Sequence, residues 1–510
     1  MDVASRDPPA VPVARTGWTT WYFRIHRWLT QPEYRRLRWV LGIGLLVRLI
    51  LAPLTSWSVD TPGSVVAGVS ALYYGNPYVG TTWFNPPLGP FLAAPFIAVP
   101  SLLYGPQGLI QVVSAIAPMT VATGVNAVSV PIPAALLAWK LPLIGADVLG
   151  AVALYALGGT LAPYSRLPPA TLAAAWFLNP LVIWASAVHG EVDSLAAACV
   201  LVFLWSSVQG RWAPAGLFLG LAIFAKGYPL VLLPLAITAV LAWPGAGGRR
   251  WQTRFVDLGW WAVGIGTSLL AFFEFIPQTL AVLTEKGGHP TYGGITVLSV
   301  FNAASPKGAS GWYFQFATNL SEAGNLLLLF RVLASLGIAA GVALLAYHLR
   351  YDAPSDSGRL RVFSLAALLA VTGLLLADPD PEPENVIAVL PLLLLTLTYG
   401  RPNWGWWAYW LLSLSGIALY WAFLTPAAMF YPLANLLGTP AVDWVNGVAI
   451  GYVRVASLSG SIWLAAGLVG GASLIAIWAR AGYRLMSSST WKKIRGVWRI
   501  REAVVGRPPL

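Results

Sequence analysis

Long runs of apolar residues, separated by short polar connections, extend along most of the chain. Runs such as Leu326–Tyr347, Val362–Ala377 and Ser461–Ala479 come close to the roughly 18–20 apolar residues that a helix needs to cross a bilayer. About 12 to 14 such spans fit the pattern, which predicts an all-α protein: one polytopic transmembrane helical bundle over residues 39–479. The expected spans are 39–57, 87–104, 108–125, 131–158, 169–187, 194–208, 212–225, 228–243, 258–277, 326–347, 360–377, 385–400, 404–424 and 457–479.

The chain has a formal net charge of +12. Its basic residues are concentrated in the two ends of the chain and in alternate connections between the spans. By the positive-inside rule these segments lie on the cytoplasmic side, so both termini are cytoplasmic and the number of spans is even. Residues 1–38 and 480–510 pair their basic residues with tryptophan, which favours interfacial tails on anionic lipid over nucleic-acid binding. We therefore expect both segments to be cytoplasmic tails.

The composition excludes several kinds of chemistry. Cys199 is the single cysteine, so neither an internal disulfide nor a cysteine metal site is available. No Walker loop, dinucleotide-binding fingerprint or internal repeat occurs, which argues against soluble nucleotide handling. Residues 1–38 are polar, basic and aromatic, so we expect no cleavable signal peptide. These features fit an integral protein of a prokaryotic plasma membrane and leave an internal eukaryotic membrane open as an alternative.

Asp60 follows the first span and opens a loop rich in proline and aromatic residues. Residues 62–73 place apolar side chains at helical spacing, which predicts a helix lying in the membrane interface as part of the first outer loop. Two interpretations of Asp60 stay open: it caps this helix, or it faces a cleft as a functional carboxylate. Thr61, before Pro62, is a suitable cap and would leave Asp60 free.

Two more polar groups fall on the same expected side of the membrane as Asp60. The segment from His189 to Asp193 places an imidazole and two carboxylates, Glu191 and Asp193, between apolar runs. Charges within a bilayer are costly, so this segment either lines an aqueous cavity or is an exposed loop. Its spacing matches no firm metal-ligand motif, and we expect no metal site.

Lys226 is a lone cation at the outer end of a span, where the positive-inside rule gives no reason for it. It either extends to the interface or binds a lipid-linked phosphate. His289, in a Gly-rich outer loop, is a candidate for substrate contact.

Some remaining charges have a structural interpretation. Lys140 and Asp147 lie seven positions apart on one helix face and are expected to pair within the bundle, as are Arg331 and Glu274. The acidic run Asp378–Glu384 is expected to form a stiff hairpin between spans.

The order of the motifs resembles a known superfamily. Asp60, Gly75-Asn76-Pro77-Tyr78 and Asn85-Pro86-Pro87 resemble the first outer loop of the GT-C integral-membrane glycosyltransferases. Lys140-Leu141-Pro142 with Asp147, Asn179-Pro180 followed by His189–Asp193, and Lys226-Gly227-Tyr228-Pro229 with Pro234 are similar to its polyprenyl- or dolichyl-phosphate-mannose-dependent branch. Glu191 departs from this pattern, which has glutamine there.

This resemblance implies a reaction and a set of roles. A hexose such as mannose would pass from a polyprenyl-phosphate donor to a glycan, glycolipid or glycoprotein acceptor on the non-cytoplasmic face, with no soluble cofactor. Asp60 matches the catalytic acid of the superfamily and would be the general base. Lys226 would stabilise the leaving phosphate, with His289 as a helper, while His189, Glu191 and Asp193 would bind hydroxyl groups of the donor or acceptor.

Two other functions remain open. A transporter or flippase of lipid-linked sugars would also need a large bundle with charges inside it, although inverted repeats are then expected. A non-catalytic subunit of a glycosylation complex would retain the fold without the activity.

Overall fold

The computed structural model describes residues 32–57, 60–81, 85–113, 130, 132–162, 167–242, 251–286, 294–299, 320–351, 355–379, 381–397, 403–422, 429–438, 440–441, 443–444 and 456–487. These parts of the chain are helices and their connections, and no strand occurs among them. The expected all-α class is confirmed.

The helices of the first half are α2 (Arg35–Leu54), α3 (Asp60–Tyr74), α4 (Leu88–Tyr104), α5 (Pro106–Val113), α7 (Pro133–Leu161), α8 (Pro169–Phe177), α9 (Pro180–Ile183), the π-helical turn η3 (Trp184–His189), α10 (Asp193–Val208), α11 (Trp212–Ala225) and, after the turn η4 (Tyr228–Leu232), α12 (Leu233–Ala242). Those of the second half are α13 (Trp251–Ala271), the turn η5 (Phe273–Phe275), α14 (Ile276–Lys286), α16 (Leu320–Tyr351), α17 (Asp356–Ala377), the turn η6 (Pro383–Ala388), α18 (Leu390–Leu397), α19 (Asn403–Ala422), α21 (Tyr431–Leu437) and α23 (Ala456–Met486).

Most of the described helices fall within the expected spans, although most of the expected span 108–125 lies outside the described residues and fewer helices than expected are long enough to cross a membrane alone. Five described helices meet the length and hydropathy needed, or up to seven if two bent pairs count as spans. Five shorter apolar helices of 10–17 residues accompany them, among them α4, α10 and α11. The chain is therefore a multi-pass membrane protein in which two of the described spans are bent helix pairs.

One of the breaks lies at Asn179-Pro180, where α8 and the α9–η3 segment meet at 48°. Proline lacks the N–H that would continue the α8 hydrogen bonding, and it fits the first position of α9. The Asn179 side chain accepts from the Leu181 N–H at 2.8 Å, so it caps the new helix. The expected span 169–187 is therefore two helical pieces.

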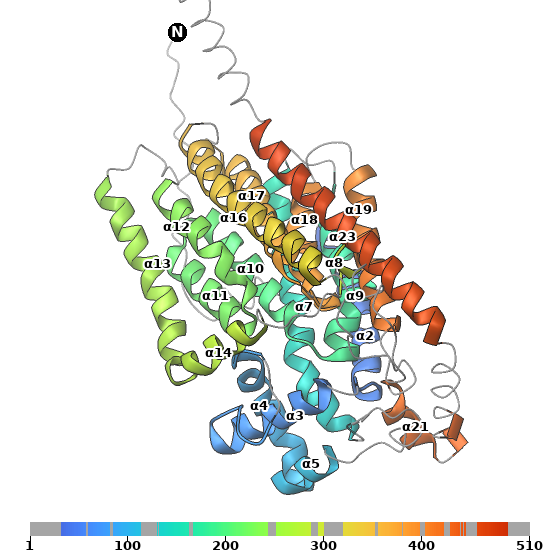
Figure 1. Cartoon of the computed structure of the whole chain (residues 1–510). Coiled ribbons are helices and arrows are strands. Elements are labelled where there is room, and N and C mark those ends of the chain that lie inside the picture. The colour runs from blue at the N-terminus through green and yellow to red at the C-terminus, as the bar shows by residue number, and fades with distance from the viewer. Residues whose placement is uncertain are drawn as a thin grey trace, which may run out of the picture.

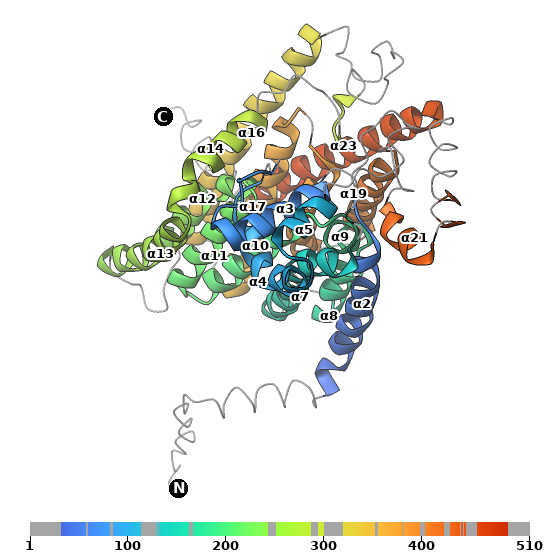
Figure 2. The same ribbon diagram turned by 90° about the horizontal axis from the view of Figure 1, so that it is seen from below.

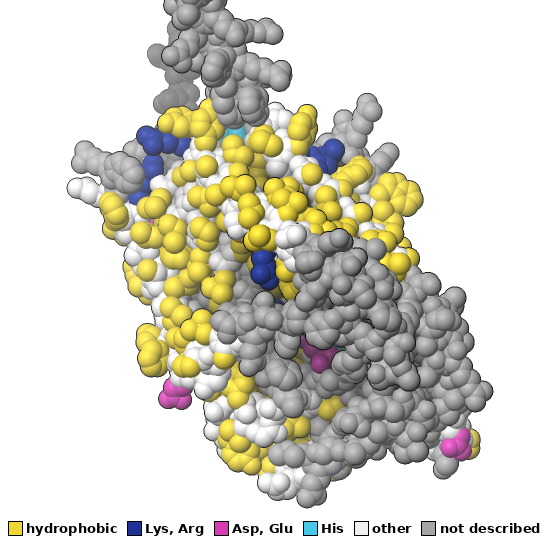
Figure 3. Space-filling view, viewed as in Figure 1, with side chains coloured by type: hydrophobic (Ala, Val, Ile, Leu, Met, Phe, Trp, Pro, Cys, Tyr) yellow, Lys and Arg dark blue, Asp and Glu magenta, His cyan; other side chains and the backbone are white. Residues whose placement is uncertain are grey.

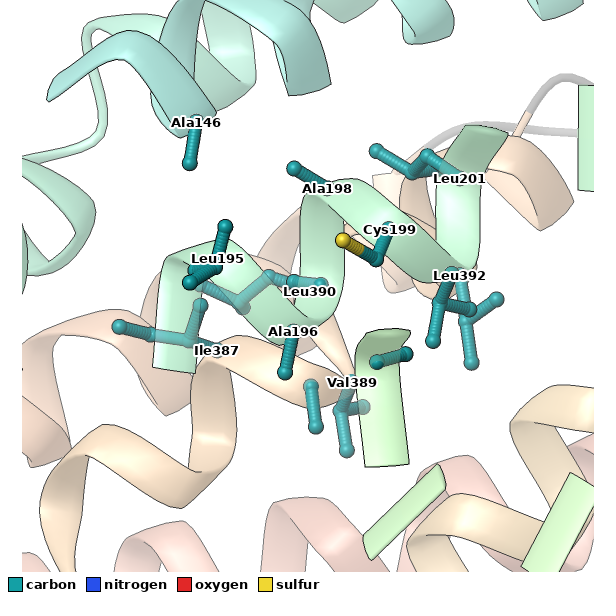
Figure 4. Packing of buried hydrophobic residues seen from close by; sticks show 14 of the residues in the cluster. Ala146, Leu195, Ala196, Ala198, Cys199, Leu201, Ile387, Val389, Leu390 and Leu392 are labelled. Carbon is teal, nitrogen blue, oxygen red and sulfur yellow. The ribbon is translucent and has the colours of Figure 1, made fainter. Parts of the chain in front are cut away.

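Helix α10 forms the centre of the bundle and is buried along nearly its whole length. Figure 4 shows Ala146 of α7 on one side of it and Ile387, Val389 and Leu390 of the η6–α18 segment on the other. Because α10 begins at Asp193, this packing fixes the start of the helix where the polar residues lie.

The first loop folds as helices α3, α4 and α5 at one end of the molecule (Figures 1 and 2). The expected helix over 62–73 is confirmed within α3, but Val65 and Val69 are fully buried in the bundle core. A Cβ on Gly68 would collide with the Ile97 side chain of α4, so α3 and α4 pack closely at this glycine. The apolar face of α3 is therefore packed against protein.

The outer surface is strongly apolar along the long helices, where side chains such as Leu46 of α2, Val263 of α13 and Leu336 of α16 are more than half exposed. Figure 3 shows this apolar belt, with two groups of Lys and Arg side chains near the upper end of the molecule and one further basic patch near the middle of the face. Such a belt is suited to contact with lipid chains.

The expected pairs within the bundle are wrong. Asp147 pairs with Arg48 of α2, whose Nε donates to Oδ2 at 2.7 Å with both side chains fully buried. Lys140 donates instead to main-chain carbonyls, those of Thr55 at 2.7 Å and Val188 at 2.8 Å. Arg331 donates to the Ala377 carbonyl at 3.4 Å, and no Arg331–Glu274 ion pair occurs in the described part of the chain. Helix α2 supplies a buried cation that spacing within α7 does not reveal.

Candidate functional site

The start of α3 and the end of η3 are held together by hydrogen bonds between side chains and main-chain groups. The Thr61 hydroxyl donates to the His189 carbonyl at 2.7 Å and accepts from the Trp57 N–H at 2.8 Å. Thr61 therefore links two segments and is not the helix cap that we expected. Lys140 also links these two parts of the chain, because its ammonium group donates to the Thr55 and Val188 carbonyls.

Gly190 lets the chain turn sharply after His189. Its φ of 88° is a left-handed conformation that glycine adopts without strain. A Cβ there would approach Trp139 Nε1 to 3.0 Å, and the indole N–H donates to the Gly190 carbonyl at 2.8 Å. After this turn the side chains of His189 and Glu191 approach each other, with His189 Nε2 3.6 Å from Glu191 Oε1.

A chain of four polar side chains runs inward from Asp60. Asp60 Oδ2 lies 2.8 Å from His189 Nε2, and His189 Nδ1 lies 3.0 Å from the Tyr420 hydroxyl. The Tyr420 hydroxyl donates to Glu384 Oε2 at 2.8 Å. Asp60 has 44% of its side chain exposed and His189 only 3%, so Asp60 stands at the mouth of a buried polar cluster.

Lys226 joins this cluster from the end of α11. Its Nζ lies 2.9 Å from Asp193 Oδ2 and 3.8 Å from Glu191 Oε2. Burial alone would lower the pKa of Lys226, but Asp193 and Glu191 raise this pKa well above its usual value. The ammonium group therefore stays protonated and offsets part of the negative charge of these two carboxyl groups.

Glu191 lies between the two halves of the cluster, with Oε1 3.6 Å from His189 Nε2. Burial raises the pKa of its carboxyl; Lys226 and His189 lower this pKa, while Asp60 and Asp193 raise it again. The site thus combines several acids with few cations and favours the binding of polar or positively charged groups.

Aromatic rings form a wall beside the imidazole. The ring centres of Trp57 and Tyr420 lie 5.2 Å and 5.3 Å from that of His189, and Trp184 lies 5.7 Å from Tyr420. These rings are largely buried and hold the imidazole in place from two sides.

Two sets of three donors could also hold a cation. The ligand atoms of Asp60, His189 and Glu191 lie within 4.8 Å of one another, as do those of Glu191, Asp193 and Glu384. In the second set, Lys226 already lies against two of the three carboxylates. In this second set the Lys226 ammonium group occupies the place beside the carboxylates that a metal ion would need.

Five of the six residues predicted from the sequence come together here: Asp60, His189, Glu191, Asp193 and Lys226. His289 lies outside the described residues. Sequence analysis missed Tyr420 and Trp57, and it placed Glu384 in a stiff hairpin when its side chain is buried in the cluster. The signal for Glu384 was an acid directly followed by a strongly apolar run.

Comparison with protein families gives a match over residues 53–314, slightly more than half of the chain, to the family described as GPI transamidase subunit PIG-U. The chain belongs to the PIG-U family. The matched region contains α3, α10 and α11 and so includes Asp60, His189–Asp193 and Lys226.

Curated relatives of this PIG-U family member include two fungal proteins, each named GPI mannosyltransferase 1. That of Eremothecium gossypii is 34% identical over 89 residues, which are 17% of this chain and 21% of the relative. That of Saccharomyces cerevisiae is 30% identical over 96 residues, 19% and 24% of the two chains. The chain thus spans under a quarter of these relatives, whose names confirm the expected GT-C, mannosyltransferase-like resemblance. Being fungal, they give no support to the expected prokaryotic membrane.

Two solved structures are similar over most of the chain. ArnT from Cupriavidus metallidurans, bound to undecaprenyl phosphate, gives a TM-score of 0.41 at 14% identity, covering 89% of this chain and 78% of ArnT. The oligosaccharyltransferase of Archaeoglobus fulgidus gives 0.34 at 12% identity, covering 88% and 56%.

Proposed function

We propose that this protein is a membrane glycosyltransferase that moves a mannose-type hexose from a polyprenyl-phosphate donor to an acceptor on the non-cytoplasmic face, with both termini cytoplasmic. The mannosyltransferase relatives support the reaction class. The observation that carries the proposal is the half-exposed Asp60 carboxylate, held 2.8 Å from His189 at the mouth of a buried polar cluster. An acceptor hydroxyl can reach this carboxylate, which is what a general base requires.

The proton taken from the acceptor has a path away from the surface. As the acceptor oxygen attacks the anomeric carbon, its proton passes to Asp60, and the bond from that carbon to the donor phosphate breaks. His189 adjoins Asp60, and Tyr420 and Glu384 continue the hydrogen-bonded chain inward. Asp60 can therefore share the proton with His189, which keeps the base ready for the next turnover.

Lys226 is proposed to act within the acidic cluster. Its two contacts with Asp193 and Glu191 hold those carboxylates in place for sugar or acceptor hydroxyl groups. A bound donor phosphate would have to share the ammonium group with them. His289 stays a predicted substrate contact.

The test is Asp60→Asn. An amide keeps the shape of the side chain but accepts no proton at neutral pH, so turnover should fall by about 10²–10⁴-fold. We would measure transfer from a synthetic polyprenyl-phosphate-mannose to extracted acceptor lipids, using purified protein. Asp356→Asn is the matched control, because Asp356 is an exposed acid that pairs with Arg359 at the other end of the bundle. Wild-type turnover in Asp60→Asn would remove Asp60 from catalysis.

A second candidate is a subunit that binds a glycolipid without transferring sugar. The family match favours it, since the description of that family names a transamidase subunit. The site would then hold a mannose-bearing glycolipid through Asp60 and Glu191. In that case wild-type protein would show no transfer from any polyprenyl-phosphate sugar, yet would still bind the glycolipid.

A further inference from the structure

A groove at the opposite end of the bundle has the chemistry of a lipid headgroup site. It lies where α17, α18, α19 and α23 meet (Figure 1). Leu368 and Ile477 line its floor, and Thr396, Trp404, Arg480 and Arg484 line its rim. We call this the Arg480–Arg484 groove.

The two arginines are held in place without an acidic partner. Arg484 Nη1 donates to the Thr396 carbonyl at 3.1 Å, in the last turn of α18. The Arg480 guanidinium lies 5.0 Å from the centre of the Trp404 ring. Neither arginine makes an ion pair with an acid in the described part of the chain. Each guanidinium has five N–H donors, and most of them can therefore bind an anion.

The surroundings place this charge at the depth of lipid headgroups. Trp404, Trp407 and Trp410 of α19 are 38%, 68% and 37% exposed, and exposed tryptophans mark the membrane–water interface. Arg361 of α17 adds a third positive charge that acts on Arg484. The groove therefore presents a cationic rim beside interfacial tryptophans, which matches the anionic headgroup of a lipid.

We propose that the Arg480–Arg484 groove binds the phosphate headgroup of an anionic phospholipid at the rim formed by these two arginines and Trp404. This site is distinct from the Asp60 cluster and independent of the sugar-transfer proposal. Basic residues that served only the positive-inside orientation would not need to be fixed in position, whereas Arg484 is held by the Thr396 carbonyl and Arg480 lies against Trp404.

The experiment is native mass spectrometry of the full chain in detergent, titrated with phosphatidylglycerol. The double variant R480Q/R484Q removes two charges, each worth about 1 kcal/mol near a membrane surface, so lipid retention should fall by about thirtyfold. The matched control is Arg359→Gln, which removes one charge at the same end of the bundle from a residue already paired with Asp356. That control should retain the lipid as wild type does.

Three results would overturn the proposal: equal retention by wild type and R480Q/R484Q, an equal loss in Arg359→Gln, or equal retention of phosphatidylcholine by wild type. Inorganic phosphate displacing the lipid with equal affinity would also overturn it, because a free anion would then be the ligand. Should the double variant fail to fold, Arg480→Gln alone replaces it, since the Arg480 side chain is exposed and lies against the Trp404 ring; lipid retention should then fall by about fivefold.

Discussion

The Tyr420 hydroxyl sets how protons are arranged around His189. If Glu384 is a carboxylate it can only accept, so Tyr420 donates to it and accepts from His189 Nδ1. Nε2 then faces Asp60 either as the second N–H of an imidazolium or as an acceptor from protonated Asp60. With Glu384 as a carboxylate, Asp60 and His189 would thus hold one proton between them, and Asp60 could act as a base only once that proton had left.

Tyr420→Phe should therefore slow transfer more than it harms substrate binding. The variant leaves His189 Nδ1 and Glu384 without their shared partner, at a cost of about 1–3 kcal/mol in stability. We expect lower kcat with nearly unchanged KM, and a pH–rate profile displaced from that of wild type. Tyr409→Phe is the control, since Tyr409 also bonds a buried side chain, Asn179 at 2.7 Å, away from the cluster. Matching pH–rate profiles for Tyr420→Phe and wild type would show that Tyr420 only packs.

Lys226 and Asp193 should behave as one unit in stability measurements. Removing one partner of a buried ion pair typically costs about 3–5 kcal/mol, because the other charge stays buried. Lys226→Met and Asp193→Asn should each lower the thermal midpoint strongly, and the double variant should lose much less than the two added together. Additive losses in the double variant would mean that the 2.9 Å contact contributes no coupling.

At this scale the sequence identified the acids and cations but not their partners. Asp60, His189, Glu191, Asp193 and Lys226 stand out because charges are rare in an apolar chain. Tyr420 and Trp57 did not stand out, because aromatic residues are frequent throughout this sequence. The pairing of Asp147 with Arg48 joins residues 99 positions apart, which spacing within one helix cannot reveal.

Among the elements, helices α11 and α13 approach each other through small residues. A Cβ on Gly216 would collide with the Trp261 carbonyl, and one on Gly264 with the Ala213 carbonyl. Gly216 and Gly220 are four positions apart on α11, the spacing that lets membrane helices pack closely. Since α11 ends beside Lys226, this contact also positions the cation of the site.

Gly216→Leu should separate the two helices and lower both stability and activity. The new side chain would meet the backbone of α13, which cannot move aside as a flexible side chain can. We therefore expect the free energy of unfolding to fall by about 1–3 kcal/mol or more, as in overpacked cores. Thermal melts of the purified protein would measure it. Gly259→Leu is the control, because no atom lies within 4 Å of a Cβ at that position on α13. Equal melting midpoints for the two variants would contradict the close crossing.

Helix positions were predictable because hydrophobic runs and Pro or Gly breaks determine them locally. The burial of α3 was not, since the stripe containing Val65 and Val69 suits a membrane interface and a protein core equally well. The bend at Asn179-Pro180 was likewise hidden, although Pro180 was visible, because a continuous apolar run suggested one span.

For the whole molecule, the expected sidedness follows from where the polar groups lie. The Asp60 cluster is at the end formed by α3 and α4, and basic residues gather at the other end (Figure 3). The sequence predicted this separation from the alternation of basic loops. It did not predict which distant helices bring Tyr420 and Glu384 to the cluster, because helix order along the chain does not fix helix neighbours in space.

Cysteine labelling in intact cells tests the orientation. Val79, in the exposed turn after α3, should become accessible to an impermeant maleimide as Val79→Cys, because we place that end outside. Gln209→Cys, in the exposed turn between α10 and α11, should react only after the cells are permeabilised. The native thiol gives a low background, since Cys199 is only 3% exposed within α10. Labelling of Gln209→Cys but not Val79→Cys in intact cells would invert the topology, and the Asp60 cluster would then face the cytoplasm.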